Sequence, residues 1–194
     1  MRVDVLFPLA IASHEIDPLL ADSVEQIFLE RLSNMPRCAT HYGDFFLERK
    51  VIDLEHDVPE LYEEILTCKN AYYQTTGLDT TPGEVEFWTQ DYSDEGLYHR
   101  RHHHGTNGIS GIYWIRANEH APNITFYSPN IQSSYARYSM DTSFSWSNYS
   151  YTPKKGTILL FPSYLEHEVG ISVKETVRST IAFNFPLILE RKKK

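Results

Sequence analysis

Three consecutive histidines, His102, His103 and His104, have the type and spacing of metal ligands. In an extended chain neighbouring side chains alternate, so His102 and His104 face one way and His103 faces the other. A further histidine, His167, lies 63 positions after His104. Two imidazoles from one strand and a third from a distant strand can close one face of a metal's coordination sphere. Imidazole binds iron, zinc, copper or nickel, so these residues alone do not name the metal.

Arg178 follows His167 by 11 positions. A guanidinium is a planar clamp for a carboxylate, which a metal ion by itself is not. The spacing therefore predicts a mononuclear metal site with an acidic co-substrate beside it. The alternative for a histidine-rich tract is a solvated loop that binds metal adventitiously.

Composition and charge narrow the function classes. A chain of 194 residues is long enough for one domain with a hydrophobic core. The net charge of −8 disfavours broad nucleic-acid binding, although Arg100 and Arg101 could form a local basic patch. No run approaches the roughly 20 apolar residues of a membrane span. Cys38 and Cys68 match no disulfide framework, which favours reduced cysteines and a cytoplasmic location.

Two amphipathic helices are expected in a helical part spanning about residues 1–80. Residues 1–13 favour a first strand over a signal peptide, since the apolar run is short and interrupted. Asp17 can cap a helix that starts at Pro18 and continues to Leu32. Asp57 is expected to start a second helix, which Gly77 closes.

Short strands follow in a core of about residues 84–187, at 85–92, 109–115, 124–127, 157–161 and 177–185. Helices first and strands after predict an α+β fold, with helices buttressing an antiparallel barrel or double sheet. In the last strand Arg178, Thr180 and Asn184 share one face. That face either lines a ligand cavity or meets solvent. The aromatic, serine-rich segment 129–151 is either a lid or binding loop or one further hairpin.

The site residues and the strands around them resemble a family, the phage and bacterial 2-oxoglutarate/Fe(II)-dependent oxygenases related to prolyl 4-hydroxylases. The resemblance spans roughly residues 85–186 and rests on four blocks in order: His102-x-His104, residues 109–114, residues 156–167 and residues 178–184. It implies a double-stranded β-helix, that is, a jelly-roll or cupin-like core. It also implies a dioxygenase, typically a hydroxylase, that uses Fe(II), 2-oxoglutarate and O2.

The resemblance also assigns roles to individual residues. His102, His104 and His167 correspond to the metal ligands, and Arg178 to the residue that binds the far carboxylate of 2-oxoglutarate. The remaining co-substrate candidates are Thr180, Tyr92 and, more weakly, Ser110. Trp114 stands where relatives often have a pocket tyrosine.

His104 departs from the wider superfamily, which has Asp or Glu two residues after the first histidine. Three neutral imidazoles give Fe(II) one negative charge fewer than a site with two histidines and one carboxylate. Asp91, Asp94 or Glu95 could supply a carboxylate instead. His103 and His99 are expected at the rim or behind the ligands.

The substrate is expected to be a peptide side chain or a small molecule, and a homodimer is possible through an exposed sheet edge. Two alternatives stay open: a three-histidine cupin-type dioxygenase that does not use 2-oxoglutarate, and a non-enzymatic jelly-roll protein that binds a metal or metabolite.

Overall fold

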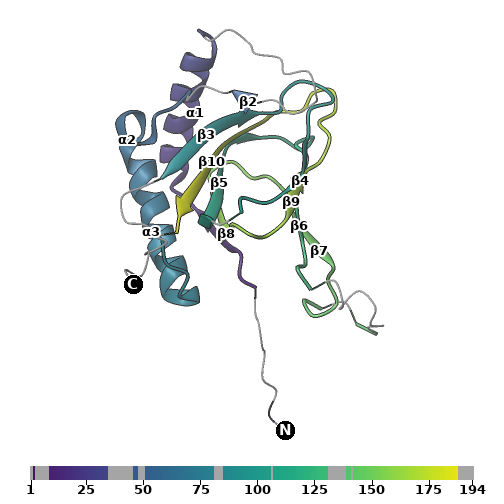
Figure 1. Cartoon of the computed structure of the whole chain (residues 1–194). Helices are drawn as coiled ribbons and strands as arrows, with labels where there is room; N and C mark the ends of the chain where they lie inside the picture. The colour runs from purple at the N-terminus through teal and green to yellow at the C-terminus, as the bar shows by residue number, and fades with distance from the viewer. Residues whose placement is uncertain are drawn as a thin grey trace.

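Two antiparallel β-sheets face each other, and helices cover the outer side of the larger one (Figure 1). The computed structural model describes residues 2, 9–34, 46–47, 51–80, 85–105, 107–130, 139–140 and 142–187. The larger sheet has the order β1-β8-β5-β10-β3-β2, and the smaller has the order β4-β9-β6-β7. Their strands are β1 (Ala12–Glu15), β2 (Phe46–Leu47), β3 (Glu86–Asp91), β4 (His99–His102), β5 (Asn107–Ala117), β6 (Ile124–Tyr127), β7 (Asn148–Tyr151), β8 (Thr157–Pro162), β9 (His167–Val169) and β10 (Arg178–Pro186). The expected α+β double-stranded β-helix with N-terminal helices is confirmed.

Helix α1 (Pro18–Leu32) begins as expected, because the Asp17 carboxylate accepts hydrogen bonds from the backbone N–H groups of Leu19 and Leu20. Helix α3 (Pro59–Thr76) ends at Gly77, whose φ of 71° is the left-handed conformation that glycine adopts without strain.

The expected start of the second helix at Asp57 is wrong. Asp57 closes a separate short helix, α2 (Leu54–Asp57), and its carboxylate accepts the Asp53 backbone N–H and pairs with Arg31. Helix α3 instead begins at Pro59 without a side-chain cap. Proline at the first helical position needs no hydrogen-bond partner for its nitrogen, so the helix start is compatible with an uncapped end.

The helices pack on the larger sheet through an apolar core. It includes Val24 and Phe28 of α1, Ile65 of α3, and Ile181 and Phe183 of β10, all fully buried. Full burial of each such side chain stabilises the fold by about 1.5–3 kcal/mol. Among the described residues, no helix is both long and apolar enough to cross a membrane.

The opposite face of β10 points between the two sheets. Arg178, Thr180 and Asn184 are at most 4% exposed, so the solvent interpretation of this polar face is wrong. Together with the apolar interior cluster that joins both sheets, these residues make the space between the sheets partly polar. An apolar interior with a few placed polar groups is typical of a ligand cavity.

Three interpretations concern segments that the structure describes only in part. Most of residues 1–8 lie outside the described residues, and β1 begins at Ala12. The end of segment 129–151 forms β7, which pairs with β6, so the hairpin interpretation is confirmed there; residues 131–138 and 141 are outside the described range. Cys68 is a free thiol whose pKa burial raises to about 11, and Cys38 is not described.

Candidate metal centre

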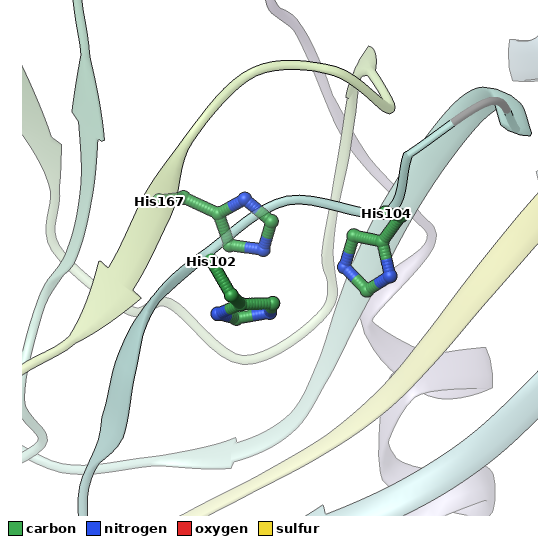
Figure 2. Close-up of side chains that lie close together, drawn as sticks. All are labelled: His102, His104 and His167. Carbon is green, nitrogen blue, oxygen red and sulfur yellow. The ribbon is translucent and has the colours of Figure 1, made fainter.

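The three predicted histidine ligands gather around one point (Figure 2). Strand β4 pairs antiparallel with β9, and this register puts His102 directly opposite His167. His104 follows the end of β4 and reaches the same point from the loop. One nitrogen from each ring lies within 4.8 Å of the others. Within the described residues, these are the only three side chains grouped closely enough to hold a metal ion.

Backbone carbonyls orient two of the rings. His102 Nδ1 lies 2.6 Å from the Arg100 carbonyl oxygen, and His167 Nδ1 lies 2.9 Å from the Leu165 carbonyl oxygen. A carbonyl only accepts, so each Nδ1 must carry the proton and donate it. Nε2 then keeps its lone pair, which is the tautomer that a metal ligand requires.

Burial keeps two of the three rings neutral near pH 7. The pKa of His167 falls to about 3, first because burial penalises the charged form and then because His102 lies beside it. The same two causes lower the pKa of His104 to about 4. Neutral imidazoles bind metal without first losing a proton, so His104 and His167 can accept a cation near pH 7.

None of the three acidic residues near the histidines joins the cluster. Asp91 Oδ1 accepts hydrogen bonds from Ser93 and Ser179 at 2.8 and 2.7 Å, and Asp91 is not in the group that could hold a metal. Asp94 and Glu95 are also absent from the group that could hold a metal. The geometry therefore favours His104 over a nearby carboxylate.

Arg178 lines the same cavity as the three histidines. Its side chain is 1% exposed, and its guanidinium lies over the Tyr92 ring with 4.5 Å between the guanidinium carbon and the ring centre. Burial lowers its pKa, and the neighbouring Tyr92 opposes that shift. Nε and Nη1 have no hydrogen-bond partner, and among the described residues no carboxylate pairs with Arg178. A buried cation in this state strongly favours an incoming anion.

The other predicted co-substrate residues have different surroundings. Tyr92 is buried, contacts Arg178, and its hydroxyl donates to Gln90 Oε1 at 3.3 Å. Thr180 is buried with an unpartnered hydroxyl. Ser110, like Tyr92 and Thr180, is not among the residues that line the cavity. The Ser110 hydroxyl is already used by Ser163 and Asn184, each at 2.7 Å.

His99 lies closer to the metal ligands than the sequence indicated. Its ring stacks on His102 at 3.9 Å between ring centres and 13° between planes, and it lines the cavity. Gln90 Nε2 lies 3.4 Å from His99 Nδ1. Residues three apart normally face opposite sides of a strand, but a register shift in β4 between His99 and His102 brings both rings to the cavity. His103 stays exposed, and its Nδ1 accepts the Gly105 backbone N–H.

Comparison with protein families finds one that matches residues 86–184, described as "Putative 2OG-Fe(II) oxygenase". The comparison with curated proteins gives no match.

Among solved structures, a prolyl hydroxylase from Trichoplax adhaerens, in complex with a hypoxia-inducible-factor oxygen degradation domain peptide, is similar with a TM-score of 0.64 and 13% identity over 95% of this chain and 87% of that one. A Pseudomonas putida prolyl-4-hydroxylase is similar with a TM-score of 0.58 and 14% identity, over 92% of this chain and 89% of that one. The non-haem, alpha-ketoglutarate-dependent epimerase SnoN of nogalamycin biosynthesis is similar with a TM-score of 0.62 and 11% identity, over 92% of this chain and 78% of that one. At these identities the likeness shows a shared fold.

Proposed function

Because the chain belongs to the 2OG-Fe(II) oxygenase family, we propose that it is an Fe(II)- and 2-oxoglutarate-dependent dioxygenase that hydroxylates its substrate. The proposal treats residues 1–194 as a single oxygenase domain, with helices in about 1–80 and the jelly-roll core in about 84–187.

One observation carries the proposal beyond family membership. The buried guanidinium of Arg178, with two unpartnered nitrogens, shares its cavity with three histidines whose nitrogens converge. A metal at the histidines would complement the lone pairs, and a carboxylate would complement the guanidinium. A dicarboxylate with a keto-acid end satisfies both at once. 2-Oxoglutarate has this chemistry.

The residues divide the work as follows. His102, His104 and His167 would hold Fe(II), and Arg178 would bind the far carboxylate of 2-oxoglutarate, with Thr180 and Tyr92 beside it. When bound, Fe(II) with 2-oxoglutarate and O2 supplies the oxidative chemistry, and 2-oxoglutarate leaves as succinate and CO2.

The protein itself orients His102 and His167 through backbone carbonyls, and it would position the co-substrate. Ser110 is better explained as a structural residue, since its hydrogen bonds are already made. With no carboxylate among the ligands, we expect iron to bind less tightly than in a two-histidine, one-carboxylate site.

The substrate class rests on analogy. The Trichoplax adhaerens prolyl hydroxylase is complexed with a peptide, and SnoN is an epimerase from nogalamycin biosynthesis. We therefore propose a peptide side chain or a small molecule, and a net charge of −8 disfavours nucleic acid. The cytoplasmic location and the possible homodimer remain predictions.

An anaerobic titration tests the proposal. Fe(II) added to the metal-free protein in the presence of 2-oxoglutarate should produce the visible absorption band of the iron chelate, and admission of O2 should yield succinate. His167→Ala should abolish both, whereas His103→Asn, which replaces an exposed histidine, should preserve them. If the wild-type protein forms neither band nor succinate, the proposal is wrong.

A second candidate is favoured by the three-histidine ligand set itself. A dioxygenase that does not use 2-oxoglutarate would bind Fe(II) through the same residues, and Arg178 would then hold a carboxylate of the substrate directly. Iron binding that 2-oxoglutarate does not perturb would support this candidate. Failure to bind iron at all would instead indicate a non-enzymatic jelly-roll protein.

A further inference from the structure

An ion pair lies directly behind two of the metal ligands, on the outer face of the smaller sheet. Arg101 precedes His102 on β4, and Glu166 precedes His167 at the start of β9. Because neighbouring side chains in a strand alternate, strands that turn these histidines inward turn the preceding residues outward. Arg101 Nε donates to Glu166 Oε2 at 2.9 Å, and Nη2 of the same guanidinium donates to the same oxygen. The ion pair therefore joins the two strands where the ligands face each other.

Tyr127 of β6 extends this contact to a third strand. Its ring lies against the Arg101 guanidinium, with 3.9 Å between the guanidinium carbon and the ring centre. Its hydroxyl donates to Glu168 Oε1 at 2.7 Å, and its backbone N–H donates to the Glu166 carbonyl at 2.9 Å. These four side chains, which we call the outer-face network, connect β4, β9 and β6, neighbours in the smaller sheet (Figure 1).

The backbone gives β4 and β9 little support of their own. The strands have four and three residues, their Cα partners are His99 with Val169 and His102 with His167, and the register shifts between these pairs. A slip of one residue would turn a ligand to the opposite face of the sheet. Opposed side chains are a main source of stability in strand pairing, so the ion pair has more influence on the register here than it would in a long sheet.

We propose that Arg101 and Glu166 are positioning residues for the metal centre, because their ion pair fixes the strand register that brings two of the ligands together. The inference rests on the metal site of the proposed function and is independent of the co-substrate. Neither residue is among those that line the cavity, so both act on the metal through the adjacent histidines.

The geometry of the ion pair makes it stronger than a simple surface contact. The two side chains are each 46% exposed, and an isolated ion pair at that exposure contributes little. Here two donors of Arg101 converge on one oxygen of Glu166, and the same cation also lies against the ring of Tyr127. Charge-assisted hydrogen bonds and cation–aromatic contacts each add to the interaction.

Position and charge predict opposite results for one variant. If Arg101 acted only through its charge, Arg101→Met would remove a cation from beside the metal, and metal binding would become tighter. If Arg101 acts by positioning, Arg101→Met weakens metal binding, as Glu166→Gln also does.

Co(II) binding to the metal-free protein, followed by visible absorption and by competition with a chelator, tests the inference. Arg101→Met and Glu166→Gln should each weaken Co(II) binding about three- to thirtyfold, the effect of losing an exposed ion pair and a cation–aromatic contact. Arg101→Glu and Glu166→Arg each place like charges opposite each other and should weaken it further. The double variant with both reversals restores opposite charges and should bind within about threefold of the wild type.

Lys154→Met is the matched control, because it also removes one positive charge and one exposed ion pair. Lys154 Nζ lies 2.6 Å from Glu15 Oε2, and both side chains are more than 60% exposed. This variant should keep the wild-type affinity for Co(II). Thermal unfolding of the metal-free proteins should show similar, small losses of stability in Lys154→Met and Arg101→Met, so a difference in Co(II) affinity between them reports positioning.

The outcomes distinguish the inference from the proposed function. Tighter Co(II) binding in Arg101→Met, unchanged affinity in both neutral variants, or a double variant that binds no better than the single reversals would overturn the positioning role and leave the proposed function in place. A wild-type protein that binds no Co(II) would contradict the metal site itself. If the single reversals do not fold, Arg101→Met and Glu166→Gln still decide.

Discussion

Two polar pairs on the same face of the same two strands have opposite hydrogen-bonding states. Asn184 and Ser110 are cross-strand partners on β10 and β5, and so, four residues along β10, are Thr180 and Trp114. At the first pair the Ser110 hydroxyl donates to Asn184 Oδ1 and also meets the Ser163 hydroxyl. At the second pair the hydroxyl and the indole nitrogen have no partner.

The difference distinguishes a pair that supports the fold from a pair that is available to bind a ligand. The satisfied pair belongs to a network that ends at Ser163, whose carbonyl accepts the His104 backbone N–H at 2.8 Å, so it supports the loop that carries a metal ligand. The unsatisfied pair lies beside Arg178, which has unpartnered nitrogens of its own. Proteins keep buried polar atoms unpaired at a cost in stability where function needs them.

The largest expected effect comes from Arg178→Met, which removes the buried charge. The affinity for 2-oxoglutarate should fall at least about thirtyfold, since a buried charged contact contributes roughly 2–5 kcal/mol to binding and about 1.4 kcal/mol is a tenfold change. Metal affinity should change little. The free energy of unfolding of the metal-free protein should rise by about 1–4 kcal/mol, because an uncompensated buried cation is removed. Calorimetric titration and urea unfolding measure these quantities, and an equal loss of metal and co-substrate affinity would contradict the role of Arg178.

The pH dependence of stability should come from the histidine cluster. Burial lowers the pKa of His99 and His167 to about 3 and that of His104 to about 4, below the ordinary value of 6.5. Above pH 6.5 both the folded and unfolded chains keep these rings neutral. As the pH falls below 6.5, only the unfolded chain gains protons, so stability decreases by up to about 1.4 kcal/mol per pH unit for each ring.

Urea unfolding of the metal-free protein at pH 7, 6 and 5 measures this effect. Thr125→Ala, which removes one member of an exposed hydroxyl pair with Ser150, should show the same pH slope as the wild type. A stability that does not change between pH 7 and 5 would show that the rings are protonated in the folded state.

Asn184→Ala should lower the free energy of unfolding by about 1–3 kcal/mol, since it leaves the buried Ser110 hydroxyl without its acceptor. Metal affinity should fall with it, because the network supports the His104 loop. Thr125→Ala, which removes one member of an exposed hydroxyl pair with Ser150, is the matched control and should cost less than about 0.5 kcal/mol. A loss in Asn184→Ala no greater than in the control would mean that the network contributes nothing.

The smallest effects are expected when one hydroxyl is removed from each polar pair, Ser110 from the satisfied pair and Thr180 from the unsatisfied pair. Ser110→Ala breaks existing hydrogen bonds and should lower the stability by about 1 kcal/mol. Thr180→Val removes an unpartnered hydroxyl and should leave the stability within about 0.5 kcal/mol or raise it. Thermal unfolding of the two metal-free variants measures both changes in stability. Equal losses of stability would contradict the contrast between the satisfied and the unsatisfied pair.

Local signals in the sequence were enough for much of the fold. Proline at the first turn and Gly77 at the end of α3 act through their own backbone conformations, so neighbouring residues suffice to locate the helices. The long apolar strands β5, β8 and β10 were likewise recognisable. Asp57 was misplaced because a capping residue and a residue that ends a preceding short helix look alike in sequence.

Two parts of the site depended on distant neighbours. Strands β4 and β9 hold only four and three residues, too few for an alternating pattern, and their pairing defines the meeting of His102 and His167. The inward position of His99 follows from a register shift that no local pattern encodes.

By itself, the sequence determined which chemical groups were available: imidazoles at strand spacing, an arginine after the last of them, and a polar face on β10. Only the tertiary structure decided which of those groups are satisfied. Ser110 and Thr180 are both hydroxyls on inward-facing strand positions, yet one is engaged by Asn184 and Ser163 and the other by nothing. Hydrogen-bond satisfaction depends on partners far apart in the chain, so it is fixed by packing and not by spacing.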